Sequence, residues 1–222
     1  MGVIDLAISE QDIKSIVQSV LSGMGISEVG AAAGSDQPKI RQKGIFVHIE
    51  DAIAAAKAAQ KEIQPMPLEF REKIIANIRK KTLENAKLFA ELGVEETKMG
   101  NVGHKILKHQ LVAEKTPGTE DLSTVAWSGD RGLTLVEQGP FGVIGAVTPS
   151  TNPSETVICN SIGMLAAGNA VVFAPHPAAK KVSNLAIDMV NRASVEVGGP
   201  ENLAVAVENP TMDVSKVIFG HK

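Results

Sequence analysis

Hydrophobic residues near the amino terminus recur with the spacing of one helical stripe. Within residues 9–22 they follow the i, i+3, i+4, i+7, i+8 pattern, at Ile13, Ile16, Val17, Val20 and Leu21. Residues 23–43 are small, polar and glycine-rich without periodicity, which predicts a flexible linker. Because a helix this short is marginal by itself, a tethered apolar stripe predicts a partner surface for residues 1–22.

The pattern from Gly44 onward predicts a helical layer. An alanine-rich helix is expected over 48–63, and another over 104–115. Between them, residues 68–98 carry two groups of apolar side chains, which suggest two consecutive helices. The period then shortens to two, so that residues 132–138 predict a strand.

Strands and helices alternate through the rest of the chain. Apolar runs predict buried strands at 143–147, 170–174 and 203–207, with helices at 153–167, 178–196 and 211–219. Short loops between such elements indicate parallel pairing in a doubly wound α/β sheet. The expected fold is a partial Rossmann-like parallel sheet with an N-terminal helical layer. Three strands make a thin sheet with an uncovered edge, so residues 44–222 are expected to form an incomplete domain.

Composition narrows the possible functions. The net charge is −3 with acidic and basic residues well mixed, so a nucleic-acid-binding surface is not expected. No apolar run reaches the roughly 18–20 residues of a membrane span, so none is expected. Cys159 is the single cysteine, which excludes an internal disulfide and favours a reducing, cytoplasmic compartment. No phosphate-binding loop and no metal-ligand cluster stands out, and the glycines at 139, 142 and 145 do not match GxGxxG.

The most informative residues follow two of the predicted strands. One segment reads PFGVIGAVTPSTNP (140–153), and the other reads LAAGNAVVFAPHP (165–177). In open α/β sheets ligands bind beyond the carboxyl ends of the strands. Residues 148–152 and 175–177 both fall there, so their side chains are expected to line one crevice.

These two motifs resemble those of the aldehyde dehydrogenase superfamily. The forms PSTNP and APHPAAKK, with ETKMG at 96–100 and TPG at 116–118, resemble more narrowly the CoA-acylating acetaldehyde and propionaldehyde dehydrogenases of bacterial microcompartments. The likeness runs over about residues 44–222. Residues 9–22 and the linker resemble the peptides that direct cargo into microcompartments.

The resemblance implies a reaction and its cofactors. A cysteine thiolate attacks a short aliphatic aldehyde, hydride passes to NAD, and coenzyme A takes the acyl group from the resulting thioester. The nucleophile of the family comes from the following domain, so this chain is expected to be inactive alone. The resemblance also implies a homo-oligomer to which the strand near 132–138 contributes, and a place inside a microcompartment through shell contacts of residues 1–22.

Asn152 matches the asparagine that holds the oxyanion in this family. An asparagine before Pro153 at a helix start is equally a common N-cap. The cofactor turn is matched by Thr148, Pro149, Ser150 and Thr151, and the loop at the nucleotide ribose by Pro175, His176 and Pro177. Hydrolytic relatives usually carry Lys at the position of Ala174 and Glu at that of Pro177, so looser nucleotide binding is expected here.

Lys180 and Lys181 are expected at a helix amino terminus, where the macrodipole disfavours cations. A bound anion at that helix end would explain them, and we predict contact with a phosphate of CoA. Cys159 is predicted to be a core residue without a catalytic role. His104 and His109 are predicted to be solvated.

Two other functions are compatible with these residues. One is a non-catalytic assembly protein, and the other is the aldehyde half of a bifunctional aldehyde–alcohol dehydrogenase. The sequence downstream of Lys222 would show whether the reading frame continues to a catalytic cysteine, which an enzyme requires and an assembly protein does not.

Overall fold

The computed structural model describes residues 42–221. The predicted helix at 1–22 and nearly all of the predicted linker lie outside these residues. None of the helices within residues 42–221 combines the length and the apolar character of a membrane-spanning segment.

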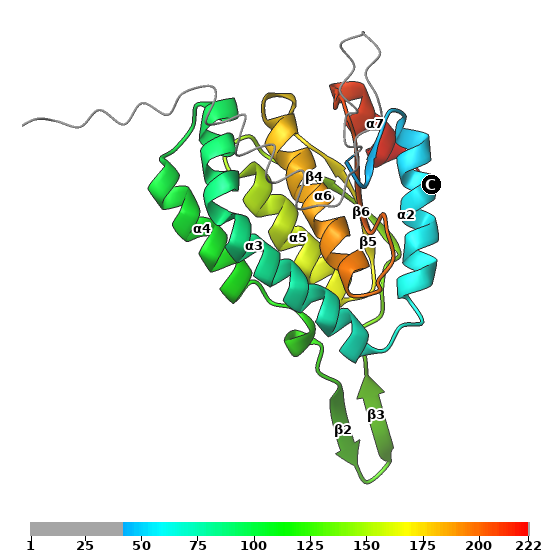
Figure 1. Cartoon of the computed structure of the whole chain (residues 1–222). Helices are drawn as coiled ribbons and strands as arrows, with labels where there is room; N and C mark the ends of the chain where they lie inside the picture. Colours follow the sequence, from blue (N-terminus) through cyan, green and yellow to red (C-terminus); the bar gives the residue numbers. More distant parts are fainter. Residues whose placement is uncertain (1–41, 222) are drawn as a thin grey trace, which may run out of the picture. The chain divides into compact units, whose positions relative to one another are not determined.

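A parallel sheet forms the centre of the structure (Figure 1). Its strands lie in the order β1-β6-β5-β4, with the bounds β1 Ile45–Phe46, β4 Val143–Val147, β5 Ala170–Ala174 and β6 Ala204–Val207. The three predicted strands and their parallel pairing are confirmed. β1 was not predicted, because two residues are too few to show a period.

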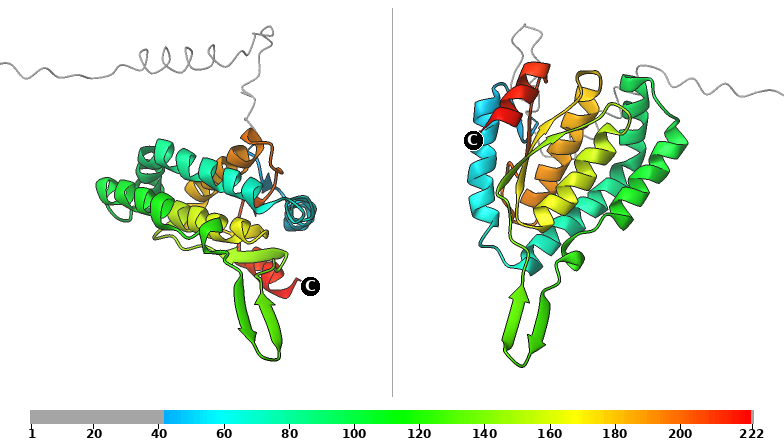
Figure 2. Two further views of the ribbon diagram at one scale, coloured as in Figure 1. Left: turned by 90° about the horizontal axis from the view of Figure 1, so that it is seen from below. Right: turned by 180° about the vertical axis from the view of Figure 1, so that it is seen from behind.

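Helices cover both faces of the sheet, as Figure 2 shows. One face carries α5 (Pro153–Ala166) and α6 (Lys180–Glu196), and the other carries α2 (Ile49–Ile63) and α7 (Met212–Gly220). The outer helices α3 (Leu68–Thr97) and α4 (Val102–Lys115) pack over α5 and α6. This is the expected α/β architecture with its helical layer. The strand β4 lies at the edge of the described sheet, and Val147 is 52% exposed, so the prediction that β4 is buried was wrong.

The prediction of two helices over 68–98 was also wrong, because α3 is one helix of 30 residues. Its buried stripe runs through Ile78, Thr82, Ala86 and Phe89, at helical spacing. The Thr82 hydroxyl is satisfied by donating to the Ile78 carbonyl at 2.8 Å. Leu83 and Leu88 of the second apolar group are exposed. Thr82 and Ala86 therefore continue the buried stripe between Ile78 and Phe89, so the helix does not break there.

A hairpin projects from the rest of the described residues (Figures 1 and 2). It pairs β2 (Val125–Gly129) with β3 (Gly132–Val136) in antiparallel register. The strand predicted near 132–138 is thus confirmed, and its partner was missed. Apolar side chains are exposed on both strands, including Trp127 at 59% and Leu135 at 59%.

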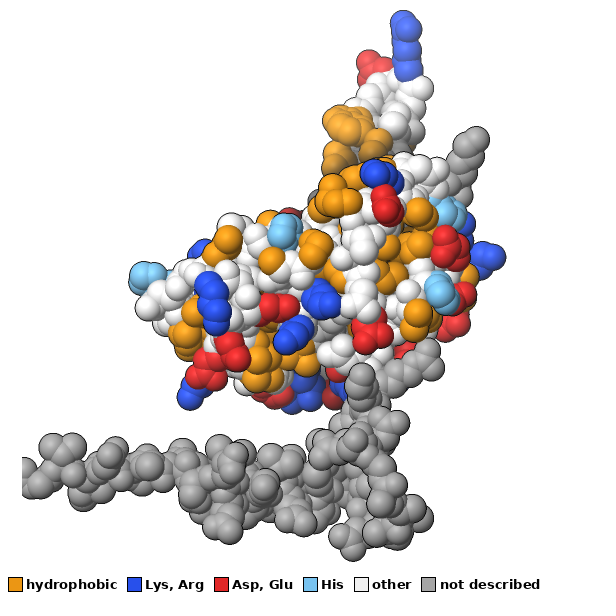
Figure 3. All heavy atoms as spheres, turned by 90° about the horizontal axis from the view of Figure 1, so that it is seen from above, with side chains coloured by type: hydrophobic (Ala, Val, Ile, Leu, Met, Phe, Trp, Pro, Cys, Tyr) orange, Lys and Arg blue, Asp and Glu red, His pale blue; other side chains and the backbone are white. Residues whose placement is uncertain are grey.

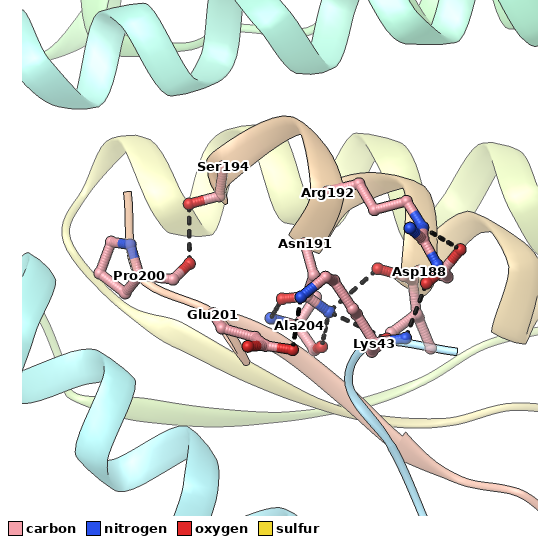
Figure 4. Close-up of polar contacts among 9 residues, drawn as sticks. Lys43, Asp188, Asn191, Arg192, Ser194, Pro200, Glu201 and Ala204 are labelled. Carbon is pink, nitrogen blue, oxygen red and sulfur yellow. Dashed lines mark hydrogen bonds and ion pairs between the residues drawn. The ribbon is translucent and has the colours of Figure 1, made fainter. Parts of the chain in front are cut away.

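Polar contacts fasten β1 to α6 and β6 (Figure 4). The backbone amide of Lys43 donates to Asp188 Oδ1 at 2.6 Å, and the Lys43 ammonium pairs with Glu201 at 3.0 Å. Asn191 exchanges hydrogen bonds with the backbone of Ala204, donating at 2.6 Å and accepting at 3.3 Å. Residue 43 therefore belongs to the folded domain rather than to the predicted linker.

Acidic and basic side chains are interspersed on the face seen in Figure 3. No continuous basic surface gathers on this face of the described residues. The mixture agrees with the small net charge of −3.

Candidate functional site

The two loops singled out in the sequence leave the same edge of the sheet. The strands β4 and β5 pair in parallel with Val147 opposite Ala174. The ladder continues one residue further, since the Thr148 amide donates to the Ala174 carbonyl at 3.1 Å. Residues 148–152 and 175–177 therefore begin side by side, and the expectation that their side chains line one crevice stays a prediction.

The Thr148–Asn152 turn presents its residues differently. Thr148 is buried, and its hydroxyl has no hydrogen-bond partner among the described residues. Pro149 and Thr151 are exposed, and Ser150 is half-buried. The exposed members can face a ligand, whereas the buried Thr148 side chain cannot.

Asn152 occupies the N-cap position of α5, but its side chain caps nothing there. Its Oδ1 instead accepts a hydrogen bond from the Lys108 ammonium of α4 at 3.0 Å. The Asn152 carbonyl accepts from the amide and hydroxyl of Thr156, at 3.0 and 2.7 Å. The side-chain nitrogen makes no hydrogen bond within residues 42–221. The plain N-cap alternative is thus not supported, and the amide N–H groups remain open to a ligand.

A buried polar cluster lies beneath this asparagine. Lys105 of α4 and Glu155 of α5 form an ion pair at 3.2 Å with side chains only 3% and 5% exposed. The Lys105 ammonium also donates to the Thr151 carbonyl at 2.9 Å. The cluster ties the turn and the first residues of α5 to α4.

His109 belongs to this cluster, so the prediction that it is solvated was wrong; His104 is exposed as predicted. The His109 ring stacks on Phe89 at 5.6 Å and lies 2.9 Å from the Ser154 hydroxyl. Burial lowers the pKa of His109, against the opposing effect of the Glu155 carboxylate. At neutral pH the imidazole is therefore neutral.

In the second loop, residues 175–177, a histidine caps the short 3-10 helix that follows. His176 Nδ1 accepts from the Ala178 amide at 3.1 Å at the start of the short 3-10 helix Pro177–Ala179. His176 and Pro177 are exposed, whereas Pro175 is buried. Because Nδ1 is the acceptor, the neutral ring carries its proton on Nε2.

The anion expected at the start of α6 is supplied by the chain itself. The Glu96 carboxylate accepts from the amides of Lys181 and Val182, at 2.8 and 2.9 Å. Lys180 donates to Asn209 Oδ1 at 2.7 Å. Both lysine side chains line a pocket of about 310 Å³ with Asn184, Glu208 and Asn209. The Asn184 Oδ1 is buried there without a partner among the described residues.

Cys159 lies on α5 and is half-buried, so the prediction of a core position is met only in part. The described residues contain no group of three or more His, Cys, Asp or Glu that could hold a metal ion.

The roles of Glu96, Lys105, Lys108 and Glu155 were not predicted from the sequence. One signal was present, because Lys105, Lys108 and His109 share one helical face by their spacing. Nothing in the spacing indicated that Glu155 would meet that face.

Known proteins are similar in sequence and structure to the part of the chain that contains this site. The sequence model of the aldehyde dehydrogenase family matches residues 41–222. An acetaldehyde dehydrogenase (acetylating) of Bilophila wadsworthia is 51% identical over an alignment of 221 positions, which covers 96% of this chain and 45% of that protein.

Two solved structures are also similar. A propionaldehyde dehydrogenase from the fucose utilisation microcompartment of Clostridium phytofermentans has a TM-score of 0.80 and 64% identity, over 81% of this chain and 41% of the other. A propionaldehyde dehydrogenase of Rhodopseudomonas palustris, solved with bound CoA and an acylated cysteine, has a TM-score of 0.78 and 48% identity, over 80% and 41%. The chain thus spans less than half the length of these relatives.

Proposed function

The chain belongs to the aldehyde dehydrogenase family, and from that premise we propose that it forms the N-terminal part of a CoA-acylating member. The proposed reaction converts a short aliphatic aldehyde, CoA and NAD⁺ to acyl-CoA, NADH and a proton. The observation that carries it is the setting of Asn152, whose amide N–H groups are open at the carboxyl edge of the sheet while Lys108 holds its oxygen. The relatives named above support the acylating form.

Asn152 supplies the polar chemistry of this part of the site. When a thiolate adds to an aldehyde carbonyl, the oxygen gains negative charge, and a fixed amide donor stabilises that charge more than it stabilises the aldehyde. The thiolate belongs to a cysteine outside this chain. NAD, when bound, accepts the hydride, and CoA provides the thiol that receives the acyl group.

The second loop and the start of α6 are proposed to hold the nucleotides. Exposed His176 and Pro177 stand beside the exposed part of the Thr148–Asn152 turn at the same sheet edge, with buried Pro175 behind them. Lys180 and Lys181 line a pocket together with Asn184, Glu208 and Asn209. The ammonium groups of the two lysines attract a phosphate, which supports a phosphate-bearing ligand at this pocket.

Two assembly roles accompany this function. The exposed apolar hairpin supports a homo-oligomer, since exposed apolar strands favour association. Residues 1–22 are proposed to bind a microcompartment shell, which would place the enzyme inside that compartment of the cytoplasm. A fluorescent reporter carrying residues 1–22 should co-localise with co-expressed shell, and lose this with Ile16→Glu plus Val20→Glu; retained co-localisation would refute the role.

The activity is tested with a composite enzyme. Residues 42–222 replace the matching part of the C. phytofermentans propionaldehyde dehydrogenase, and NADH and propionyl-CoA formation are measured with propionaldehyde, CoA and NAD. The composite should be active, whereas the 222-residue chain alone should give no NADH. A folded, correctly assembled composite without activity would overturn the proposal. Activity of the chain alone that disappears in Cys159→Ser would overturn the role given to the missing cysteine.

A further inference from the structure

Three residues of α4 fix the residues around Asn152. Lys105 donates to the Thr151 carbonyl at 2.9 Å and pairs with Glu155 at 3.2 Å. Lys108 donates to Asn152 Oδ1 at 3.0 Å. His109 lies 2.9 Å from the Ser154 hydroxyl. One face of a single helix thus contacts the backbone before Asn152, its side chain, and the helix turn after it.

The contact from Lys108 decides which way the Asn152 amide points. A lysine ammonium carries three donors and no acceptor, so the Asn152 atom beside it must be the carbonyl oxygen. The NH₂ group then faces away from Lys108. A contact from a group that can both donate and accept would leave both orientations of the amide open.

The charge of Lys108 also strengthens the amide as a donor. A cation bonded to the carbonyl oxygen polarises the amide, because hydrogen bonds in a chain reinforce one another. The N–H groups at the far end become better donors to a developing negative charge. Lys105 lacks this direct contact with the side chain, and its buried pair with Glu155 holds the backbone of the turn.

We infer that Lys108 is a positioning residue that orients and polarises the Asn152 amide, while the Lys105–Glu155 pair fixes the turn that carries it. This inference rests on the proposed function, since it assigns Lys108 a part in the oxyanion chemistry of Asn152. Lys108 itself touches neither substrate nor cofactor. Its side chain is exposed. A surface lysine of this kind ordinarily contributes little to stability, so a loss of activity without a loss of stability separates positioning from folding.

The experiment uses the composite enzyme with Lys108→Met, Lys108→Arg and the control Lys115→Met. Lys115 is another exposed lysine of α4. Lys108→Met should lower kcat on the order of tenfold, the loss expected for one charge-assisted hydrogen bond, with KM for CoA and NAD unchanged. Lys108→Arg should restore most of the rate because it keeps the cation and the donor. Lys115→Met should resemble the parent. Equal rates for Lys108→Met and Lys115→Met would overturn the inference.

A double-mutant cycle distinguishes this inference from the proposed function. If Lys108 acts through Asn152, adding Lys108→Met to Asn152→Ala should cost no further activity. A further tenfold loss would show an independent role and overturn the inference alone. If Asn152→Ala itself leaves kcat unchanged, the proposed function is overturned and the inference falls with it.

A measurement without catalysis tests the contact itself. In the 222-residue chain, the side-chain amide resonances of Asn152 can be assigned by their loss in Asn152→Asp. Lys108→Met should shift them, and Lys115→Met should not. Unchanged resonances in Lys108→Met would contradict the orienting contact.

Discussion

The carboxylate of Glu96, near the carboxyl end of α3, accepts a hydrogen bond from the backbone amide of Lys181 at 2.8 Å. Its second oxygen accepts from the Val182 amide at 2.9 Å, so the first turn of α6 is capped by a side chain 85 residues away from Lys181 in the sequence. An anion already occupies the helix end. A nucleotide phosphate in this region must therefore be held by lysine side chains rather than by the helix amides.

The side chains of Lys180 and Lys181 are predicted to bind a CoA phosphate. In the composite enzyme, Lys180→Ala combined with Lys181→Ala should raise KM for CoA much more than KM for NAD. The difference should grow at low ionic strength, because salt screens exposed charges. Steady-state kinetics at two salt concentrations provide the measurement. Equal effects on both cofactors, or none on either, would rule out the CoA-specific role.

Removal of Lys105 should destabilise the fold strongly. Lys105→Met leaves the Glu155 carboxylate buried without its partner, at a cost of about 3–5 kcal/mol in the free energy of unfolding. Lys105→Met with Glu155→Leu should recover much of that loss, because both desolvated charges are then gone. Urea denaturation of the chain compares the two variants. A double variant as unstable as the single one would show that the carboxylate is not the cause.

His109 should make the free energy of unfolding fall as the pH drops below about 6.5, the ordinary pKa of a histidine side chain. Burial beside Lys105 lowers its pKa in the folded chain, despite Glu155, so the unfolded chain binds more protons just below its ordinary value of 6.5. The stability that His109 contributes is therefore complete above that value and is lost as the pH falls below it. His109→Gln should flatten this dependence in urea titrations. The pKa values of Glu120 and Glu196 are lowered from 4.5, so these two carboxylates change the stability only at more acidic pH. Equal slopes for both proteins would contradict the burial effect.

Much of the fold followed from the sequence because its signals are local. The strands at 143–147, 170–174 and 203–207 and the helices between them have short-range periods, and parallel pairing places their loops at one edge. The elements that failed depend on distant partners. The two-residue strand β1 forms because it pairs with β6. Thr82 is buried on α3 by packing against other elements, which a polar residue in the sequence does not indicate.

The sequence predicted the two loops of the candidate site but not the contacts that hold them. Asn152 was identified by resemblance, yet the lysine that holds it comes from 44 residues upstream. Two charged residues at helix ends could have indicated one of these contacts. Glu96 lies near the carboxyl end of one helix and Lys181 near the amino end of another, and each opposes its own helix dipole. Their backbone contact explains Glu96, but the sequence could not show that the two helix ends meet.

The most direct test of the account is kcat of the composite enzyme with Asn152→Ala, beside Asn160→Ala as a control on the same helix. An oxyanion donor at Asn152 predicts a loss in kcat on the order of 10²-fold or more, with the assembly unchanged and Asn160→Ala near the parent rate. An Asn152→Ala enzyme that keeps the parent kcat would contradict the central claim and remove this residue from the chemistry.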